Sequence, residues 1–129
     1  LGVAVDVTFA QEPGLKDYTT FPLGKGPSIG LGANIHPLLH KSFVESAKAI
    51  DLPYAIETMP RSSGTDAIAM QITAAGVPTM VLGIPIRYMH TPYELTTLTD
   101  IRRTGRLLAR FITSLEAGSL ASLIRKEAA

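Results

Sequence analysis

Residues 77–84 read VPTMVLGI, an apolar run of eight residues. Because both faces of this run are apolar, it predicts a central strand of a parallel sheet that is covered on both sides. Outward from it, period-two alternation predicts a strand over residues 1–9, and residues 54–59 are a third candidate. Residues 11–34 are rich in glycine and proline, which predicts a loop with one short extended piece.

Three stretches between and after these strands have helical periodicity. The first begins at Pro37 and ends before Pro53, the second is expected over residues 65–75, and the third over residues 99–116. A short terminal helix is expected over residues 119–127. This alternation predicts an α/β fold with three layers, α/β/α, around a mostly parallel sheet. The residues that the spacing turns inward are Leu39, Phe43, Ala47 and Ile50 in the first helix, Ile68, Ile72 and Ala75 in the second, and Ile101, Leu108, Ile112 and Leu115 in the third.

Composition limits the classes of function. The 129 residues fit one domain, and hydrophobic residues make up 46% of them, enough to bury a core. The net charge of +1 gives no indication of a nucleic-acid partner or a membrane surface, and no apolar run approaches the roughly 18 residues of a membrane helix. The sequence has no cysteine, which excludes thiolate metal sites and cysteine nucleophiles and fits a reducing compartment such as the cytoplasm.

Two polar residues lie where open α/β sheets hold their ligands, at the carboxyl ends of strands. Asp6 is late in the strand predicted over residues 1–9, and His90 is in the loop that follows residues 77–84. A carboxylate and an imidazole that converge at one sheet edge suit Zn²⁺ or Co²⁺. The alternative is a capping aspartate and a loop histidine with separate partners, which the spacing alone favours.

Two patterns that look like binding sites have structural interpretations. His36 and His40 share a helix face and would form a metal clip, but the glutamate of a His-Glu-x-x-His motif is missing, so two exposed histidines are expected. Residues 24–28, GKGPS, look like a phosphate loop but lack its residue order, and Pro27 removes a backbone donor. A turn-rich loop is therefore expected there.

Two further patterns are polar clusters. The serines at 62–63 could form a hydrolytic triad with His90 and Asp66, but the sequence has no Gly-x-Ser-x-Gly elbow. A basic stripe on the third helix is expected to be a solvated face with local ion pairs, rather than a contact with an acidic partner or a subunit. It consists of Arg102, Arg106 and Arg110.

Three segments taken together resemble one known family. They are residues 5–8 (VDVT), 62–67 (SSGTDA) and 84–92 (IPIRYMHTP). In this order and at these separations they look like the glutamyl and deblocking (tetrahedral) aminopeptidases, a family of co-catalytic two-metal exopeptidases. Some of its members carry the label endoglucanase. The RYMHTP run is the most specific part, and the resemblance extends over residues 1–112.

The resemblance implies a zinc-exopeptidase-like catalytic domain that holds two divalent ions, zinc or cobalt. In this family a bridging aspartate joins the two ions, one ion also takes a histidine and an aspartate, and the other takes a glutamate and a histidine. A neighbouring glutamate is the general base. The motif match implies that Asp6 is the terminal aspartate ligand of one ion and that His90 is the final histidine ligand of the other. Gly64, Thr65 and Asp66 would help to shape the substrate pocket.

Several parts of the family pattern do not occur in these residues. They are the other metal ligands, the Glu-Glu-Val-Gly pattern that carries the base, and the inserted domain used for assembly. The chain also begins at Leu1 inside a predicted strand. We therefore interpret residues 1–129 as the C-terminal portion of the catalytic domain, with no catalytic residue of its own. The complete protein is expected to be a homo-oligomer.

The expected activity of the complete protein is removal of N-terminal residues from peptides, and residues 1–129 alone are expected to be inactive. One alternative is a hydrolase of the same fold that acts on an acylamino acid or a glycan. The glycan reading is disfavoured because glycoside hydrolysis usually needs two carboxylates that flank the sugar, and the sequence reveals no such pair. The other alternative is a non-catalytic assembly fragment or pseudo-enzyme.

Overall fold

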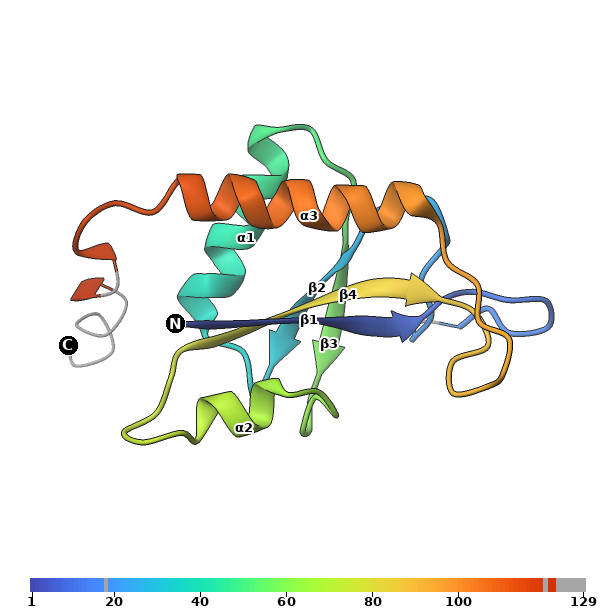
Figure 1. Cartoon of the computed structure of the whole chain (residues 1–129), viewed down its shortest axis with the longest axis horizontal. Helices are drawn as coiled ribbons and strands as arrows, with labels where there is room; N and C mark the ends of the chain where they lie inside the picture. Colours follow the sequence, from blue (N-terminus) through green and yellow to red (C-terminus); the bar gives the residue numbers. More distant parts are fainter. Residues whose placement is uncertain (18, 120, 123–129) are drawn as a thin grey trace.

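The computed structural model describes residues 1–17, 19–119 and 121–122, and its sheet has the strand order β1-β4-β2-β3. The strands are β1 (Gly2–Phe9), β2 (Ser28–Gly32), β3 (Ala55–Met59) and β4 (Thr79–Ile86). The helices are α1 (Pro37–Ala49), α2 (Ala67–Gln71) and α3 (Leu98–Thr113). Figure 1 shows α1 and α3 on one face of the sheet and α2 on the other, which confirms the three predicted layers.

The sheet consists of two parallel pairs that are joined by an antiparallel contact. β1 pairs with β4 in parallel along eight residues, and β2 pairs with β3 in parallel along five. Between these pairs, β2 and β4 run antiparallel, and their register contains only Ser28 opposite Gly83 and Ile29 opposite Leu82. The sheet is therefore mixed, with two of its three strand pairings parallel, and the contact at its middle is the narrowest.

β4 lies in the centre of the core, as its apolar run predicts. Met80, Val81 and Leu82 are at most 1% exposed. The ring of Phe43 in α1 stacks on the ring of Phe111 in α3, with a centroid distance of 4.1 Å. This stack joins the two helices that cover one face of the sheet. None of the helices in the described residues is long and apolar enough to cross a membrane.

The buried face of α3 differs from the predicted one. Ile101, Ile112 and Leu115 are 43%, 55% and 39% exposed, and Leu108 is only partly buried. The prediction was wrong for Ile101, Ile112 and Leu115, while Leu108 packs against the core. It counted apolar side chains alone, whereas two polar side chains of this helix are buried with hydrogen-bond partners. The residues that α3 buries are Asp100, Thr104, Leu107 and Phe111.

α2 is shorter than the helix predicted over residues 65–75. It ends at Gln71, and Ile72, which was expected to face inward, is 73% exposed. Ala74 has a φ of 51°, and a residue with an L side chain in this left-handed region does not continue a right-handed helix. The terminal helix predicted over residues 119–127 falls mostly outside the described residues.

A buried carboxylate holds the glycine-rich loop that precedes β2. Asp100 is 0% exposed, and its two carboxylate oxygens accept hydrogen bonds from the backbone N–H groups of Gly24 (2.7 Å) and Gly26 (2.8 Å). The guanidinium of Arg103 donates to the carbonyl of Gly24 at 2.6 Å. The amides that a phosphate would need are thus bound by α3, so the loop is a structural turn, as expected.

Side chains from three strands meet beside a glycine of the fourth. Glu57 of β3 accepts hydrogen bonds from the hydroxyls of Thr8 in β1 (2.7 Å) and Ser28 in β2 (2.5 Å). A Cβ on Gly83 of β4 would collide with the side chains of Thr8 and Ser28. We call these four residues the strand clasp. Because Ser28 lies opposite Gly83, the clasp reinforces the sheet where the backbone pairing is narrowest.

Replacement of Asp100 tests how much its anchor contributes to stability. Asp100→Ala leaves two loop amides without their acceptors, so we expect the free energy of unfolding to fall by about 2–4 kcal/mol. Asp100→Asn keeps one acceptor oxygen and should cost less. Asp66→Ala is the control, since Asp66 is exposed and makes no side-chain capping bond. Urea unfolding measures the difference, and an Asp100→Ala variant as stable as the control would contradict this account.

A pair of glycine substitutions tests the strand clasp. Gly83→Ala forces the Thr8 and Ser28 side chains apart, and overpacking of this kind typically costs about 1–3 kcal/mol. Gly105→Ala is the matched control because a Cβ at Gly105, in the middle of α3, meets nothing within 4 Å. That change should stabilise the protein by roughly 0.5–1 kcal/mol through helix propensity. The order of the two thermal unfolding midpoints checks the prediction, and it fails if Gly83→Ala is harmless.

Candidate functional site

A cavity of about 250 Å³ lies at the carboxyl ends of the parallel strands β1 and β4, and it is also lined by Glu57 of β3 and by residues 63–65. β1 and β4 are parallel, so the end of β1 and the loop after β4 meet at one edge of the sheet. The same cavity therefore collects predicted site residues from segments far apart in the sequence. Its walls include Asp6 and Thr8 of β1, Glu57 of β3, Gly64 and Thr65 of the turn before α2, and His90.

Asp6 lies on β1 opposite Gly83 of β4 and is exposed. One of its carboxylate oxygens, Oδ1, accepts the backbone N–H of Val7 at 2.7 Å. Within the described residues no hydrogen bond uses the other oxygen, Oδ2. The side chain is therefore fixed by a local bond and still presents an acceptor to the cavity.

His90 belongs to the loop between β4 and α3, and it has a φ of 63°. Tyr88, two residues earlier, has a φ of 59°. A residue with an L side chain pays about 1–2 kcal/mol for this left-handed conformation. The backbone N–H of His90 donates to Oε1 of Glu94 at 2.8 Å. Its exposed imidazole makes no hydrogen bond to another described residue, so both ring nitrogens are available to a ligand.

The turn before α2 contributes part of the cavity wall. The Ser63 hydroxyl and the Thr65 hydroxyl share a hydrogen bond of 2.9 Å, and the Ser63 N–H donates to Oδ1 of Asn34 at 2.9 Å. Gly64 and Thr65 line the cavity, whereas Asp66 is exposed at the N-cap of α2 and does not. Within the described residues no hydrogen bond joins a serine, His90 and Asp66, so the geometry gives no support to a hydrolytic triad.

Sequence reasoning missed Glu57. It lines the cavity beside Asp6, so the cavity has a second carboxylate, contrary to the expectation that no such pair exists. The carboxyl-end rule does not select Glu57, because it lies in the middle of β3, which runs antiparallel to β1 and β4. Both Glu57 oxygens already accept hydroxyl hydrogen bonds, and within the described residues Glu57 has no cationic partner. Its present role is thus to hold the sheet beneath the cavity.

The donor atoms of the cavity are a partial set for a metal ion. A carboxylate oxygen and an imidazole nitrogen are ligands that zinc and cobalt accept. The described residues contain no group of three or more His, Cys, Asp or Glu side chains placed to hold an ion together. Asp6 and His90 therefore fit as ligands in a site that needs further donors.

The two other histidines were expected to be exposed, and this was wrong. His36 is 9% exposed and caps α1, where its ring accepts the Leu38 N–H at 3.3 Å. The ring of His40 is hydrogen-bonded to the carbonyl of Gly30 at 2.7 Å. The two rings thus have separate structural partners and form no metal clip. The stripe Arg102, Arg106 and Arg110 is exposed, and none of the three forms an ion pair with a described residue.

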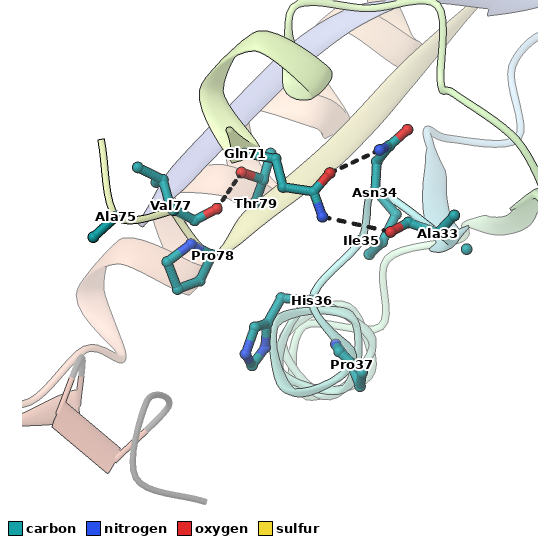
Figure 2. A pocket seen from close by; sticks show the side chains of 12 residues that line it. Ala33, Asn34, Ile35, His36, Pro37, Gln71, Ala75, Val77, Pro78 and Thr79 are labelled. Carbon is teal, nitrogen blue, oxygen red and sulfur yellow. Dashed lines mark hydrogen bonds between the residues drawn. The ribbon is translucent and has the colours of Figure 1, made fainter. Parts of the chain in front are cut away.

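A larger cavity, of about 680 Å³, lies near the end of β2 and the start of β4, away from Asp6 and His90. Figure 2 shows the amide of Gln71 directed toward Asn34 and the carbonyl of Ala33. Among the described residues that line this cavity, His36 is the one titratable residue. We prefer the smaller cavity as the functional site, because it brings together two carboxylates and an imidazole.

Comparison with known proteins identifies relatives of the chain. The family model for M42 glutamyl aminopeptidases matches residues 1–107. The lysyl aminopeptidase of Pyrococcus furiosus is 44% identical over 116 residues, which are 90% of this chain and 34% of that protein. The chain spans about a third of the length of the curated relatives it matches.

Solved structures have the same fold. Aminopeptidase APDkam598 of Desulfurococcus kamchatkensis is 28% identical with a TM-score of 0.83, and the match covers 94% of this chain and 36% of that one. The Pyrococcus horikoshii TET1 peptidase, which can assemble into a tetrahedron or a large octahedral shell, is 25% identical with a TM-score of 0.65. That match covers 88% of this chain and 34% of the TET1 chain. The chain therefore belongs to the M42 glutamyl aminopeptidase family.

Proposed function

We propose that the complete protein that carries residues 1–129 is a two-metal aminopeptidase that removes N-terminal residues from peptides. The observation that supports this proposal is the meeting of Asp6 and His90 in one cavity, since the family resemblance assigns these residues to the two ions. In this proposal residues 1–129 are the C-terminal portion of the catalytic domain. The remaining ligands and the general-base glutamate belong to the other two thirds of the protein.

The ions, zinc or cobalt, would supply Lewis acidity and a water of lowered pKa when bound. Asp6 would present its free oxygen to one ion, while the Val7 N–H fixes the other oxygen. His90 would present a ring nitrogen to the second ion from a loop that is held by its backbone. Gly64 and Thr65 would shape the wall against which the substrate lies, whereas Asp66 is outside the lining of this cavity.

The proposal includes a location and a quaternary structure. A cysteine-free sequence suits the cytoplasm, where thiols are reduced and disulfides add no stability. A relative that assembles into closed shells supports a homo-oligomer for the complete protein. The peptide substrate would then be bound at the sheet edge described above, with neither nucleic acid nor membrane as a partner.

Because the cavity contains two carboxylates, a glycan is the second substrate class to test. Asp6 and Glu57 could in principle flank a sugar, but the Glu57 carboxylate is occupied by two hydroxyls. A panel of aminoacyl anilides beside an acylamino acid and a soluble cellulose separates the three substrate classes. We expect the complete protein to release the amine only from substrates with a free N-terminus.

Residues 1–129 alone should have no peptidase activity. Loss of the general base by itself typically lowers the rate by about 10²–10⁴-fold, and two ligands cannot hold two ions in register. The measurement is release of p-nitroaniline by the pure 129-residue chain, with added Zn²⁺ or Co²⁺ and with a chelator. The complete protein is the positive control. A chelator-sensitive activity in the isolated chain would refute this division of the site.

His90→Ala in the complete protein should weaken the binding of one of the two ions. We expect the metal content after dialysis to fall from about two ions to about one per chain, and kcat/KM to fall by at least about 100-fold. His40→Ala is the matched histidine control, because His40 bonds to Gly30 and does not line the cavity. If the His90 variant kept both ions and its full rate, His90 would not be a ligand.

A further inference from the structure

The loop that carries His90 is closed at its base. Arg87 and Leu95 exchange two backbone hydrogen bonds, of 2.8 Å and 3.2 Å, so residues 88–94 form a loop whose ends are fixed together. The side chain of Arg87 also donates to the carbonyl of Gln11 at 2.8 Å. The two ends of the loop are therefore bonded to each other, and Arg87 also bonds to the segment that follows β1.

Within this closed loop, two residues have a conformation that their side chains disfavour. Tyr88 and His90 have φ angles of 59° and 63°, where glycine is usually found. Such conformations persist only where neighbouring groups hold them in place, and they often occur at functional sites. The question is therefore which groups hold this backbone.

Two carboxylates hold it, one for each residue. Oε1 of Glu94 accepts the N–H of His90 at 2.8 Å, and Oε2 of Glu12 accepts the N–H of Tyr88 at 3.2 Å. A hydrogen bond to a charged acceptor is stronger than one between neutral groups. The Thr91 hydroxyl adds a bond to the carbonyl of Tyr88 at 2.6 Å. The shorter carboxylate bond is the one at the predicted metal ligand.

This arrangement differs from the usual support of a histidine ligand. In most metal sites a carboxylate or carbonyl accepts the second ring N–H of the histidine and so orients the ring. Here no hydrogen bond joins the imidazole of His90 to a described residue, and the carboxylate binds the backbone of the same residue instead. The orientation of the ring thus depends on the backbone conformation that Glu94 stabilises.

We propose that Glu94 is a positioning residue for metal binding: it accepts the backbone N–H of His90 and so holds the imidazole at the cavity that Asp6 lines. This inference rests on the proposed function, because it takes His90 to be a ligand. Without Glu94 the residue relaxes toward an ordinary φ, and the imidazole leaves the cavity wall. Glu94 therefore controls the affinity for the metal ion and does not control the chemistry of the metal-bound enzyme.

The test is isothermal titration calorimetry, in which Zn²⁺ is added to the complete protein after its metal has been removed. Glu94→Ala should raise the Kd of one Zn²⁺ by about 10–100-fold and leave the other unchanged. Glu94→Gln keeps a neutral acceptor and should show a smaller rise, which is a partial rescue. The control is Glu45→Ala, since Glu45 on α1 pairs only with Lys41 at 3.9 Å within the described residues. At saturating Zn²⁺ the kcat of Glu94→Ala should return close to that of the wild type.

The outcomes separate this inference from the proposed function. If His90→Ala loses one Zn²⁺ while folded Glu94→Ala binds both with wild-type Kd, the positioning role is wrong and the metal assignment stands. If the wild type binds no pair of ions and releases no N-terminal residue, the proposed function itself is wrong. Should Glu94→Ala fail to fold, Glu94→Asp withdraws the carboxylate by one methylene, and wild-type Zn²⁺ affinity in that variant would equally overturn the inference.

Discussion

The carboxylate of Glu57 is the constraint on which the sheet depends. Backbone pairing between the two halves of the sheet is limited to two register positions, Ser28 with Gly83 and Ile29 with Leu82. Here the Glu57 carboxylate accepts hydrogen bonds from the hydroxyls of Thr8 and Ser28, which are 3% and 0% exposed. These bonds link three strands through their side chains. An unpaired hydroxyl in so buried a position is costly, so each member of the strand clasp needs the others.

The strand clasp also explains why the candidate site lies where it does. Thr8 is two residues after Asp6, so the two side chains share a face of β1. The Thr8–Glu57 hydrogen bond links the end of β1 to the middle of β3, and both residues line the cavity. The polar groups that hold the sheet lie beneath the cavity, and the ones free to bind lie at its rim.

Parts of this architecture could be read from the sequence because each depends on local pattern. The apolar run of β4 implies burial on both faces, and the carboxyl-end rule places Asp6 and His90 together once β1 and β4 are parallel. The buried face of α3 could not be read, because Asp100 is buried for the sake of two amides in a loop about 75 residues earlier. Glu57 was missed for the same reason, because its hydroxyl partners Thr8 and Ser28 lie 49 and 29 residues earlier. Glu94 was missed because its partner is the backbone N–H of His90, and the sequence does not reveal the positive φ of that residue.

β1 has a property that concerns the behaviour of this segment in solution. Within the described residues it is one of the two edge strands of the sheet, and its Val5, Val7 and Phe9 are 44%, 38% and 54% exposed. An outer strand with unpaired backbone groups and apolar side chains is a template for strand addition by any similar chain. Segments of this kind are commonly protected by charge or proline, and β1 has only Asp6. A chain whose β1 edge is left unpaired is therefore prone to aggregate, and its solubility depends on what pairs with that edge as well as on its own surface.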